Sequence, residues 1–252
     1  MKAEIYDALW KSLEDERLVA VTTVVVGKGV GRQMVLWPSG ATLGDLGSEN
    51  ANTWARESVQ EAFDRFASRR ETVDAGGEEI DLFIEVHPPR PRLIVVGAGH
   101  VAIPLVAFAK TLGFRTHVVD PRSVFATEER FAHADELIVA WPQEALERIG
   151  LNESTYVAVL SHDLKIDVPA LALTLRSPAR YVGVLGSKKT HAKRVAALRE
   201  AGLGDDEIAR VHAPIGIDLG ARNPEEIAVA IIAEIVAASH GLRTDGGRRA
   251  AR

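Results

Sequence analysis

The sequence predicts an α/β protein in which a mostly parallel sheet domain follows a small α+β domain. The first observation is that, after residue 92, short apolar segments alternate with helical patterns, which is typical of a parallel sheet covered on both faces. The second is the segment HPPRPR at residues 87–92, whose prolines fix φ and lack N–H donors. We therefore expect an extended linker there, between an N-terminal domain at residues 1–86 and a C-terminal domain at residues 93–241.

The N-terminal part contains both helical and strand-like patterns. Its segment LVAVTTVVV is rich in β-branched residues, which favour strands. Later, Leu82, Ile84 and Val86 alternate with polar neighbours after the Gly76-Gly77 pair, a pattern that predicts a hairpin. Helices are predicted at residues 3–15 and 49–68, and strands at residues 18–26, 33–37, near 73 and at 80–86.

The C-terminal part shows β-α-β alternation up to its last helix. That helix has the clearest start signal, because Asn223 can cap it, Pro224 suits its first position and Glu226 completes a capping box. Beyond it, the basic segment at residues 242–252 is expected to be a solvated tail. Strands are predicted at residues 92–96, 115–119, 137–140, 156–160 and 181–185, and helices at residues 101–112, 168–176 and 188–201, from Pro142 and from Pro224.

Composition and charge exclude several classes of protein. The 252 residues carry a net charge of −5, which argues against nonspecific nucleic-acid binding. The chain has no cysteine, which excludes disulfides and thiolate ligands, and its histidines show no metal-ligand spacing. No apolar run approaches the roughly 20 residues that span a membrane, and the first residues predict an amphipathic helix rather than a signal peptide. We expect a cytoplasmic protein with no metal site.

A glycine-rich turn is the strongest single motif. In LIVVGAGHVA, Gly97 permits a tight turn, Gly99 allows close approach of a pyrophosphate, and Ala102 takes the small third position. Asp120 ends the next strand, where a ribose-binding acid would lie. These features predict a Rossmann-like domain with a phosphate-bearing cofactor, the alternative being a domain that has lost its ligand. His100 either faces this ligand or caps the following helix.

Polar residues also follow a later strand, at the sheet edge where ligands bind in such folds. Ser161, His162 and Asp163 are adjacent, and consecutive side chains cannot align as a hydrolytic triad. They are either ligand contacts, or Ser161 and Asp163 are caps of the next helix with His162 solvated. Asp167 lies further along the same segment.

The turn after the next strand is suited to an anion. Gly186 and Ser187 can offer donors, and Lys188 begins a pair of lysines near a helix start, although no Walker A pattern is present. In the glycine-rich loop before the last helix, Asp218 either contacts a ligand or supports the loop. A solvated helix face is expected at Lys193, Arg194 and Arg199.

Several of these segments together resemble one family, the XdhC/CoxI proteins. They are GAGHVA, VVDPRSVFA, LSHDLKIDVPAL, YVGVLGSKK and PIGIDLGARNPEEIAVAIIAEIVA, in the family's order across residues 93–241. The resemblance implies a cytoplasmic accessory protein, or chaperone, that binds molybdenum cofactor (molybdopterin) and delivers it to a xanthine dehydrogenase-type molybdoenzyme, without turnover chemistry of its own. It also implies a cysteine desulfurase partner, and a cofactor held between the domains or across a homodimer.

The resemblance also implies a set of ligand contacts. The pterin cofactor carries a phosphate, which suits a glycine turn at a helix N-terminus. In the N-terminal part, the family's Gly/Ser/Pro/Arg loop is shortened to GKGVGRQM, and its stretch with Cys and Glu is reduced to GDLGSEN, without a cysteine. Carried over by position, the implied contacts are Gly97, Gly99, His100, Asp120, Arg122, Ser161, His162, Asp163, Gly186, Ser187, Lys188 and Asp218.

Two other functions are compatible with the motifs. An NAD(P)-dependent oxidoreductase would use the glycine turn and Asp120, but no proton-relay pattern such as Y-x-x-x-K is found, since Leu160 stands four residues after Tyr156. A nucleotide-sensing module would use the same domain as a switch and would change its oligomeric state on binding nucleotide.

Overall fold

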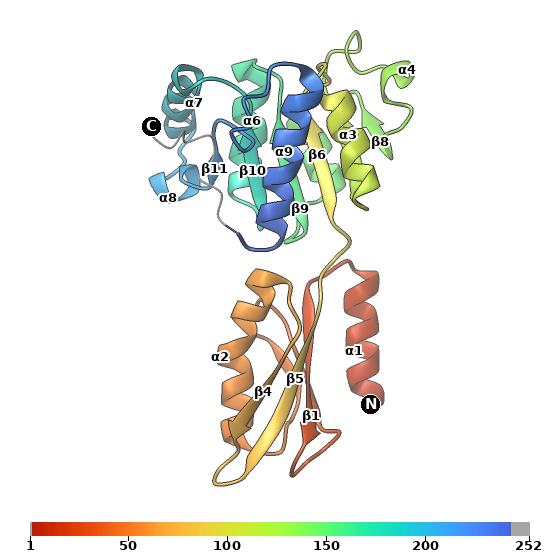
Figure 1. Cartoon of the computed structure of the whole chain (residues 1–252), viewed down its shortest axis with the longest axis vertical. Coiled ribbons are helices and arrows are strands. Elements are labelled where there is room, and N and C mark those ends of the chain that lie inside the picture. The colour runs from red at the N-terminus through yellow and green to blue at the C-terminus, as the bar shows by residue number, and fades with distance from the viewer. Residues whose placement is uncertain (1, 243–252) are drawn as a thin grey trace. The chain divides into compact units, whose positions relative to one another are not determined.

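The computed structural model describes residues 2–242 and divides between Pro89 and Arg90 into two compact units (Figure 1). The last strand of the first unit extends to His87, and the first strand of the second begins at Arg92. The extended connection is therefore confined to residues 88–91, shorter than the expected linker. Of the expected basic tail, only Leu242 lies within the described residues.

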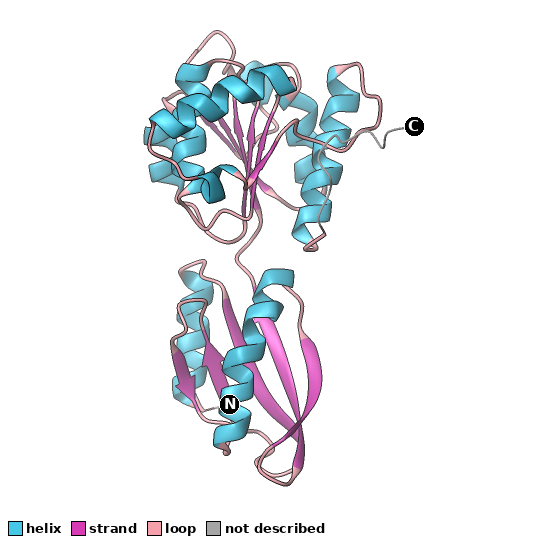
Figure 2. Ribbon diagram, turned by 90° about the vertical axis from the view of Figure 1, so that its left-hand side faces the viewer, coloured by secondary structure: helices cyan, strands magenta, loops and turns pink. Residues whose placement is uncertain are grey.

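The N-terminal unit is an antiparallel sheet with one helix on each face, which confirms the α+β prediction (Figure 2). The strand order is β3-β2-β1-β5-β4, and strand β1 is largely buried because helices α1 and α2 pack on opposite sides of the sheet. Strand β3 was not predicted. The elements are α1 (Ala3–Glu14), β1 (Val19–Val26), β2 (Gln33–Leu36), β3 (Thr42–Gly44), α2 (Glu49–Arg65), β4 (Arg69–Asp74) and β5 (Glu79–His87).

Helix α2 ends earlier than its apolar pattern predicts. The helix stops at Arg65 because Phe66 adopts a left-handed backbone with φ of 49° and acts as the C-cap. The ring of Phe66 still packs against the core of the unit, together with Val59 and Phe63. The prediction that the helix extends to residue 68 was therefore wrong by about one turn.

The C-terminal unit is a parallel sheet covered on both faces, which confirms the Rossmann-like prediction. The strand order is β11-β10-β9-β6-β7-β8; helices α3 and α9 cover one face, and α5, α6 and α7 cover the other (Figures 1 and 2). The elements are β6 (Arg92–Val96), α3 (Ala102–Thr111), β7 (Arg115–Val119), α4 (Glu128–Phe131), β8 (Glu136–Ile138), α5 (Pro142–Ile149), β9 (Thr155–Val159), α6 (Leu164–Leu175), β10 (Tyr181–Val184), α7 (Lys188–Glu200), α8 (Asp205–Ile208), β11 (Val211–His212) and α9 (Pro224–Ser239).

Two helix starts in this unit show how well local sequence signals predict where a helix begins. The capping box of α9 is confirmed, since Asn223 Oδ1 accepts from the Glu226 N–H at 2.8 Å. Helix α6 begins at Leu164, four residues before the expected start, because Asp163 caps it and Pro169 is accommodated inside the helix. Among the described residues, no helix is both long and apolar enough to cross a bilayer.

Candidate functional site

Gly97 brings the glycine turn against the neighbouring strand end. It follows β6 with φ of 109°, and its N–H donates to the carbonyl of Val119 at 2.8 Å. A Cβ built on Gly97 would lie 2.7 Å from the backbone nitrogen of Ser161, just after β9. No side chain fits there, so Gly97 is required by the crossing of two backbone segments.

Gly99 has different surroundings, although it belongs to the same turn. A Cβ built on it would meet no atom of the described chain within 4 Å, and its φ is not positive. Within residues 2–242, the N–H groups of Gly99, His100 and Val101 have no protein acceptor. Helix α3 begins at the next residue and has no acid in its first turn. Free donors, open space and a helix N-terminus together form a cradle for an anion.

Asp120 lies beneath this cradle and is completely buried. Its Oδ2 accepts from the Ala98 N–H and from Arg122 Nη2, both at 2.8 Å, and its Oδ1 accepts from the Arg122 backbone N–H and Nε, both at 2.9 Å. Burial alone would raise the pKa of Asp120, but the hydrogen bonds from Arg122 and Ala98 outweigh burial and lower it. Asp120 therefore fixes the glycine turn and Arg122, and its oxygens are already occupied.

A pocket of about 290 Å³ opens beside the cradle, at the carboxyl ends of the central strands. This is close to the lower limit of small-molecule sites, about 300 Å³. The guanidinium carbon of Arg122 lies 4.6 Å from the ring centroid of Phe125, so these two form one wall. The apolar lining residues were not among the predicted contacts, although they lie in the same loops as residues that were. The lining residues are Gly99, His100, Val101, Arg122, Phe125, Leu160, Ser161, His162 and Leu185.

Both histidines of the lining are exposed. Val101, not His100, stands at the N-cap of α3, which favours the ligand-facing interpretation of His100 over the capping one. His162 has φ of 63°, a left-handed backbone that is uncommon outside glycine and is enriched at ligand sites. The fold thus holds His162 at the pocket in a conformation that has a steric cost.

Ser161 is connected to a buried ion pair below the pocket. Its hydroxyl donates to the carboxylate of Asp167, which is completely buried on α6. Arg194 on α7 places Nε 2.7 Å from Oδ2 of Asp167, and its side chain is only 1% exposed. The prediction that Arg194 lies on a solvated helix face was therefore wrong. The charge pattern of α7 cannot reveal an acid 27 residues earlier on another helix.

Other predicted residues lie beside the pocket or away from it. Asp163 caps α6 through the Lys165 N–H at 2.9 Å, as one of the two interpretations expected. Ser187 Oγ caps α7 by accepting from the Thr190 N–H at 3.2 Å, and Gly186 and Lys188 flank it in the turn that follows the lining residue Leu185. The exposed Asp218 accepts from the Gly220 N–H at 3.2 Å and does not line the pocket.

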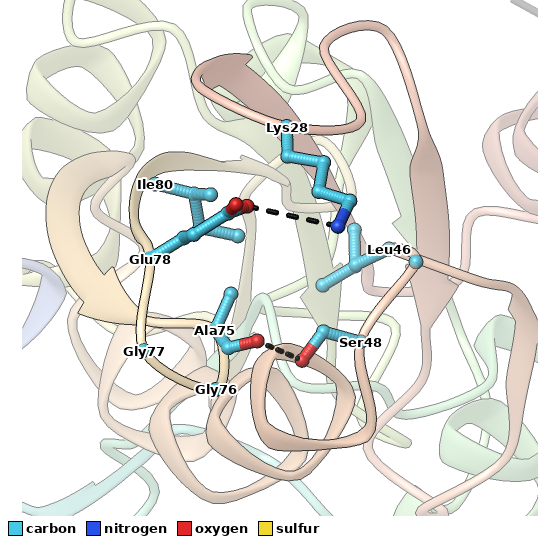
Figure 3. A pocket seen from close by; sticks show the side chains of 9 residues that line it. Lys28, Leu46, Ser48, Ala75, Gly76, Gly77, Glu78 and Ile80 are labelled. Carbon is cyan, nitrogen blue, oxygen red and sulfur yellow. Dashed lines mark hydrogen bonds and ion pairs between the residues drawn. The ribbon is translucent and has the colours of Figure 1, made fainter.

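A second hollow, of about 360 Å³, lies within the N-terminal unit (Figure 3). Lys28 comes from GKGVGRQM, and Gly47 and Ser48 come from GDLGSEN, so both shortened motifs reach it. Its polar groups pair with each other: Ser48 Oγ donates to the Ala75 carbonyl at 2.9 Å, and Lys28 Nζ lies 3.8 Å from Glu78. The pocket of the C-terminal unit is the stronger candidate because its donors are free. Across residues 2–242, no three His, Asp or Glu side chains form a group suited to a metal ion.

Three curated proteins resemble part of this chain. The uncharacterized protein YqeB of Escherichia coli K12 is 34% identical over 164 residues, which cover 65% of this chain and 30% of that protein. A protein of Bacillus subtilis 168, named as a probable subunit of xanthine dehydrogenase, is 33% identical over 62% of this chain and 45% of its own length. The molybdenum cofactor insertion chaperone PaoD of E. coli K12 is 28% identical over 58% of this chain and 40% of its own length.

A solved structure resembles almost the whole chain. The crystal structure described as a xanthine dehydrogenase from Bacillus halodurans aligns with 93% of this chain and 66% of its own, at 26% identity and a TM-score of 0.64. The chain spans less than half the length of the three curated relatives. The XdhC Rossmann domain matches residues 93–235, which include the glycine turn and the whole pocket. The chain therefore belongs to the XdhC family.

Proposed function

We propose that this protein binds molybdenum cofactor in the pocket of the C-terminal unit and delivers it to a xanthine dehydrogenase-type molybdoenzyme, as a cytoplasmic accessory protein. The observation that carries the proposal is the cradle at Gly99, with its free N–H groups and open space at the N-terminus of α3. The terminal phosphate of the pterin cofactor suits this cradle. The names of two relatives, a probable subunit of xanthine dehydrogenase and a cofactor insertion chaperone, support the same role.

The remaining lining residues fit the rest of such a cofactor. Phe125 and Leu185 offer apolar surface to a flat ring, while Ser161 and His162 offer polar groups just after the end of β9. The cofactor supplies the molybdenum chemistry when bound, and the chain's own residues bind, orient and shield it. No residue of the pocket needs to act as a nucleophile or base in this role.

The NAD(P)-dependent alternative has less support from the same geometry. A ribose-binding acid must keep an oxygen free for a hydroxyl group. Both oxygens of Asp120 are already bonded to Ala98 and Arg122, and the carboxylate is completely buried. A dinucleotide would therefore have to displace Arg122 from its own carboxylate partner.

The decisive experiment is equilibrium binding of anaerobically prepared molybdenum cofactor and, separately, NAD(H) to the wild type and to Gly99→Asp. The new carboxylate would occupy the open space at the cradle and repel a phosphate, without strained φ. Gly204→Asp is the matched control, since it adds the same charge at the exposed N-cap glycine of α8. We expect the wild type and Gly204→Asp to bind the molybdenum cofactor and Gly99→Asp to lose this binding. A wild-type protein that binds NAD(H) but not the molybdenum cofactor would overturn the proposal.

The proposal also names partners. We propose that the protein interacts with a cysteine desulfurase and that its cofactor-loaded form is a homodimer. We expect the loaded protein to restore activity to a cofactor-free molybdoenzyme, and light scattering to report twice the chain mass. A loaded monomer that transfers the cofactor would remove the dimer from the proposal and leave delivery intact.

A further inference from the structure

We infer that Arg194 and the turn at Gly186, Ser187 and Lys188 form a second oxyanion subsite, which takes an anionic group of the ligand anchored at Gly99. The identity of that ligand rests on the proposed function. The subsite adds Arg194, which the predicted contacts did not include, to the predicted contacts Gly186, Ser187 and Lys188. The subsite belongs to the carboxyl end of β10, and the first cradle belongs to the end of β6.

The guanidinium of Arg194 is buried but only partly satisfied. Its Nε and Nη2 both lie 2.7 Å from a single oxygen, Oδ2 of Asp167. In the described part of the chain, Nη1 and Nη2 are both buried without a hydrogen-bond partner; Nη2 is close to Asp167 as an ion pair, whereas Nη1 has no such contact. Because buried arginine N–H groups are normally bonded, Nη1 is a donor for which we infer an acceptor.

The position of Nη1 shows where the acceptor belongs. A Cβ built on Gly186 would lie 3.0 Å from Nη1, so the unpaired donor lies against the turn between β10 and α7. Gly186 has φ of 140°, which other residues rarely adopt, and its lack of a side chain keeps backbone alone over the guanidinium. The acceptor for Nη1 therefore belongs at this turn.

The surroundings of the turn favour a negative group. Helix α7 has 13 residues, and its first turn carries Lys188 and Lys189 but no acid. The helix dipole adds partial positive charge at the same point. The hydroxyls of Ser187 and Thr190 lie 3.0 Å apart there and can reorient toward an acceptor. Phosphate and other tetrahedral oxyanions match this combination of Arg, Lys and hydroxyl donors.

The two subsites are linked through Asp167. This carboxylate neutralises Arg194 and holds the hydroxyl of Ser161, which lines the pocket between the two strand ends. Strands β6 and β10 flank β9 on either side, so the subsites are separated by about 10 Å, two strand spacings. The subsite therefore suits a ligand with anionic groups at both ends, the second being either a phosphate or an oxygen-bearing metal centre.

The first test observes Arg194 directly in the wild-type full chain. The protein is labelled with ¹⁵N-arginine and titrated with inorganic phosphate and, separately, with molybdate, which distinguish the two sources of the oxyanion. We expect the side-chain signals of Arg194 to shift with at least one of them, while those of the exposed Arg199 on the same helix do not. The shift should persist in Gly99→Asp. Equal responses at both arginines, or none at Arg194, would overturn the inference.

The second test uses variants that each change one cationic side chain. Arg194→Lys retains a cation facing Asp167 and removes Nη1, whereas Lys188→Ala changes only an exposed side chain. We expect each to weaken oxyanion binding about tenfold, the loss of one charge-assisted hydrogen bond. The controls Arg199→Lys and Lys193→Ala should stay within about twofold. If Arg194→Lys fails to fold, Lys188→Ala and the wild-type titration decide.

The two proposals can fail separately. Cofactor that binds equally to the wild type, Arg194→Lys and Lys188→Ala would remove the second subsite and leave the chaperone role standing. Oxyanion binding that depends on Arg194, in a protein that binds no molybdenum cofactor, would remove the chaperone role and leave the second subsite standing.

Discussion

Gly97 and Gly99 stand two residues apart, but only Gly97 is constrained by a neighbouring part of the fold. Alanine at Gly97 would place a methyl group 2.7 Å from the Ser161 backbone in a positive-φ conformation, while alanine at Gly99 would extend into open space. We expect Gly97→Ala to lower the free energy of unfolding by at least about 1–3 kcal/mol, and Gly99→Ala to change it by less than about 0.5 kcal/mol. Urea unfolding of both variants measures the difference. Equal losses would mean that Gly99 also serves the fold.

Asp135 gives the fold a specific acid sensitivity. Burial alone would raise the pKa of Asp135, but hydrogen bonds from Thr116 and Lys110 lower it to about 2. A carboxylate with a lowered pKa stabilises the fold above its unfolded pKa, and this contribution disappears as the pH falls through the folded pKa. Asp135→Asn should therefore have a lower free energy of unfolding than the wild type at neutral pH. This difference between the two proteins should shrink as the pH falls from about pH 4 to about pH 2.

Urea midpoints across this pH range, for the wild type and Asp135→Asn, give the measurement. Asp206→Asn, an exposed carboxylate of α8, is the control and should follow the wild type. A deficit that is independent of pH would show that Asp135 acts through packing and not through its charge.

At the residue scale, the sequence predicted positions better than roles. Asp120 was located correctly at the end of β7, but its bonds to Ala98 and Arg122 depend on how two loops meet. The burial of Arg194 depends on α6 and α7 lying side by side, which no local pattern encodes. Predicted contacts such as His100 and Ser161 do meet at one pocket, because parallel strands end at the same edge.

The start of α9 is an element whose stability is encoded locally. Asn223 accepts from the Glu226 N–H, and the carboxylate of Glu226 accepts from the Arg222 N–H at 2.7 Å. We expect Asn223→Ala and Glu226→Ala each to cost about 1 kcal/mol of unfolding free energy. The double variant should cost less than the sum, because each half of the box supports the other. Thermal unfolding compares them with Glu225→Ala, in the same turn, and strict additivity would contradict the reciprocal box.

Elements were predictable where they were long or had cap signals. The central strands β6, β9 and β10 were found within one residue of their observed bounds, because burial on both faces of the sheet imposes continuous apolar runs. Strands β3 and β11 and helices α4 and α8 have two to four residues each, too few for a period to show. Their positions follow from tertiary packing.

At the scale of the whole molecule, each hydrophobic core lies within one unit. The clusters around Leu82 belong to the N-terminal sheet, and those around Leu105 belong to the parallel sheet. Each core can therefore melt as a cooperative unit of its own, and ligand binding should act on only one of them.

Calorimetry of the full chain tests this arrangement. We expect two thermal transitions. Leu82→Ala should destabilise the unit that melts in one of them and Leu105→Ala the unit that melts in the other, each by about 2–5 kcal/mol of unfolding free energy, because both leucines are completely buried. Molybdenum cofactor or an oxyanion should raise only the transition that Leu105→Ala lowers, by an amount that grows with the logarithm of ligand concentration. If both transitions rise together, the ligand contacts both units, and the cofactor would then be held between the sheet domain and its smaller neighbour.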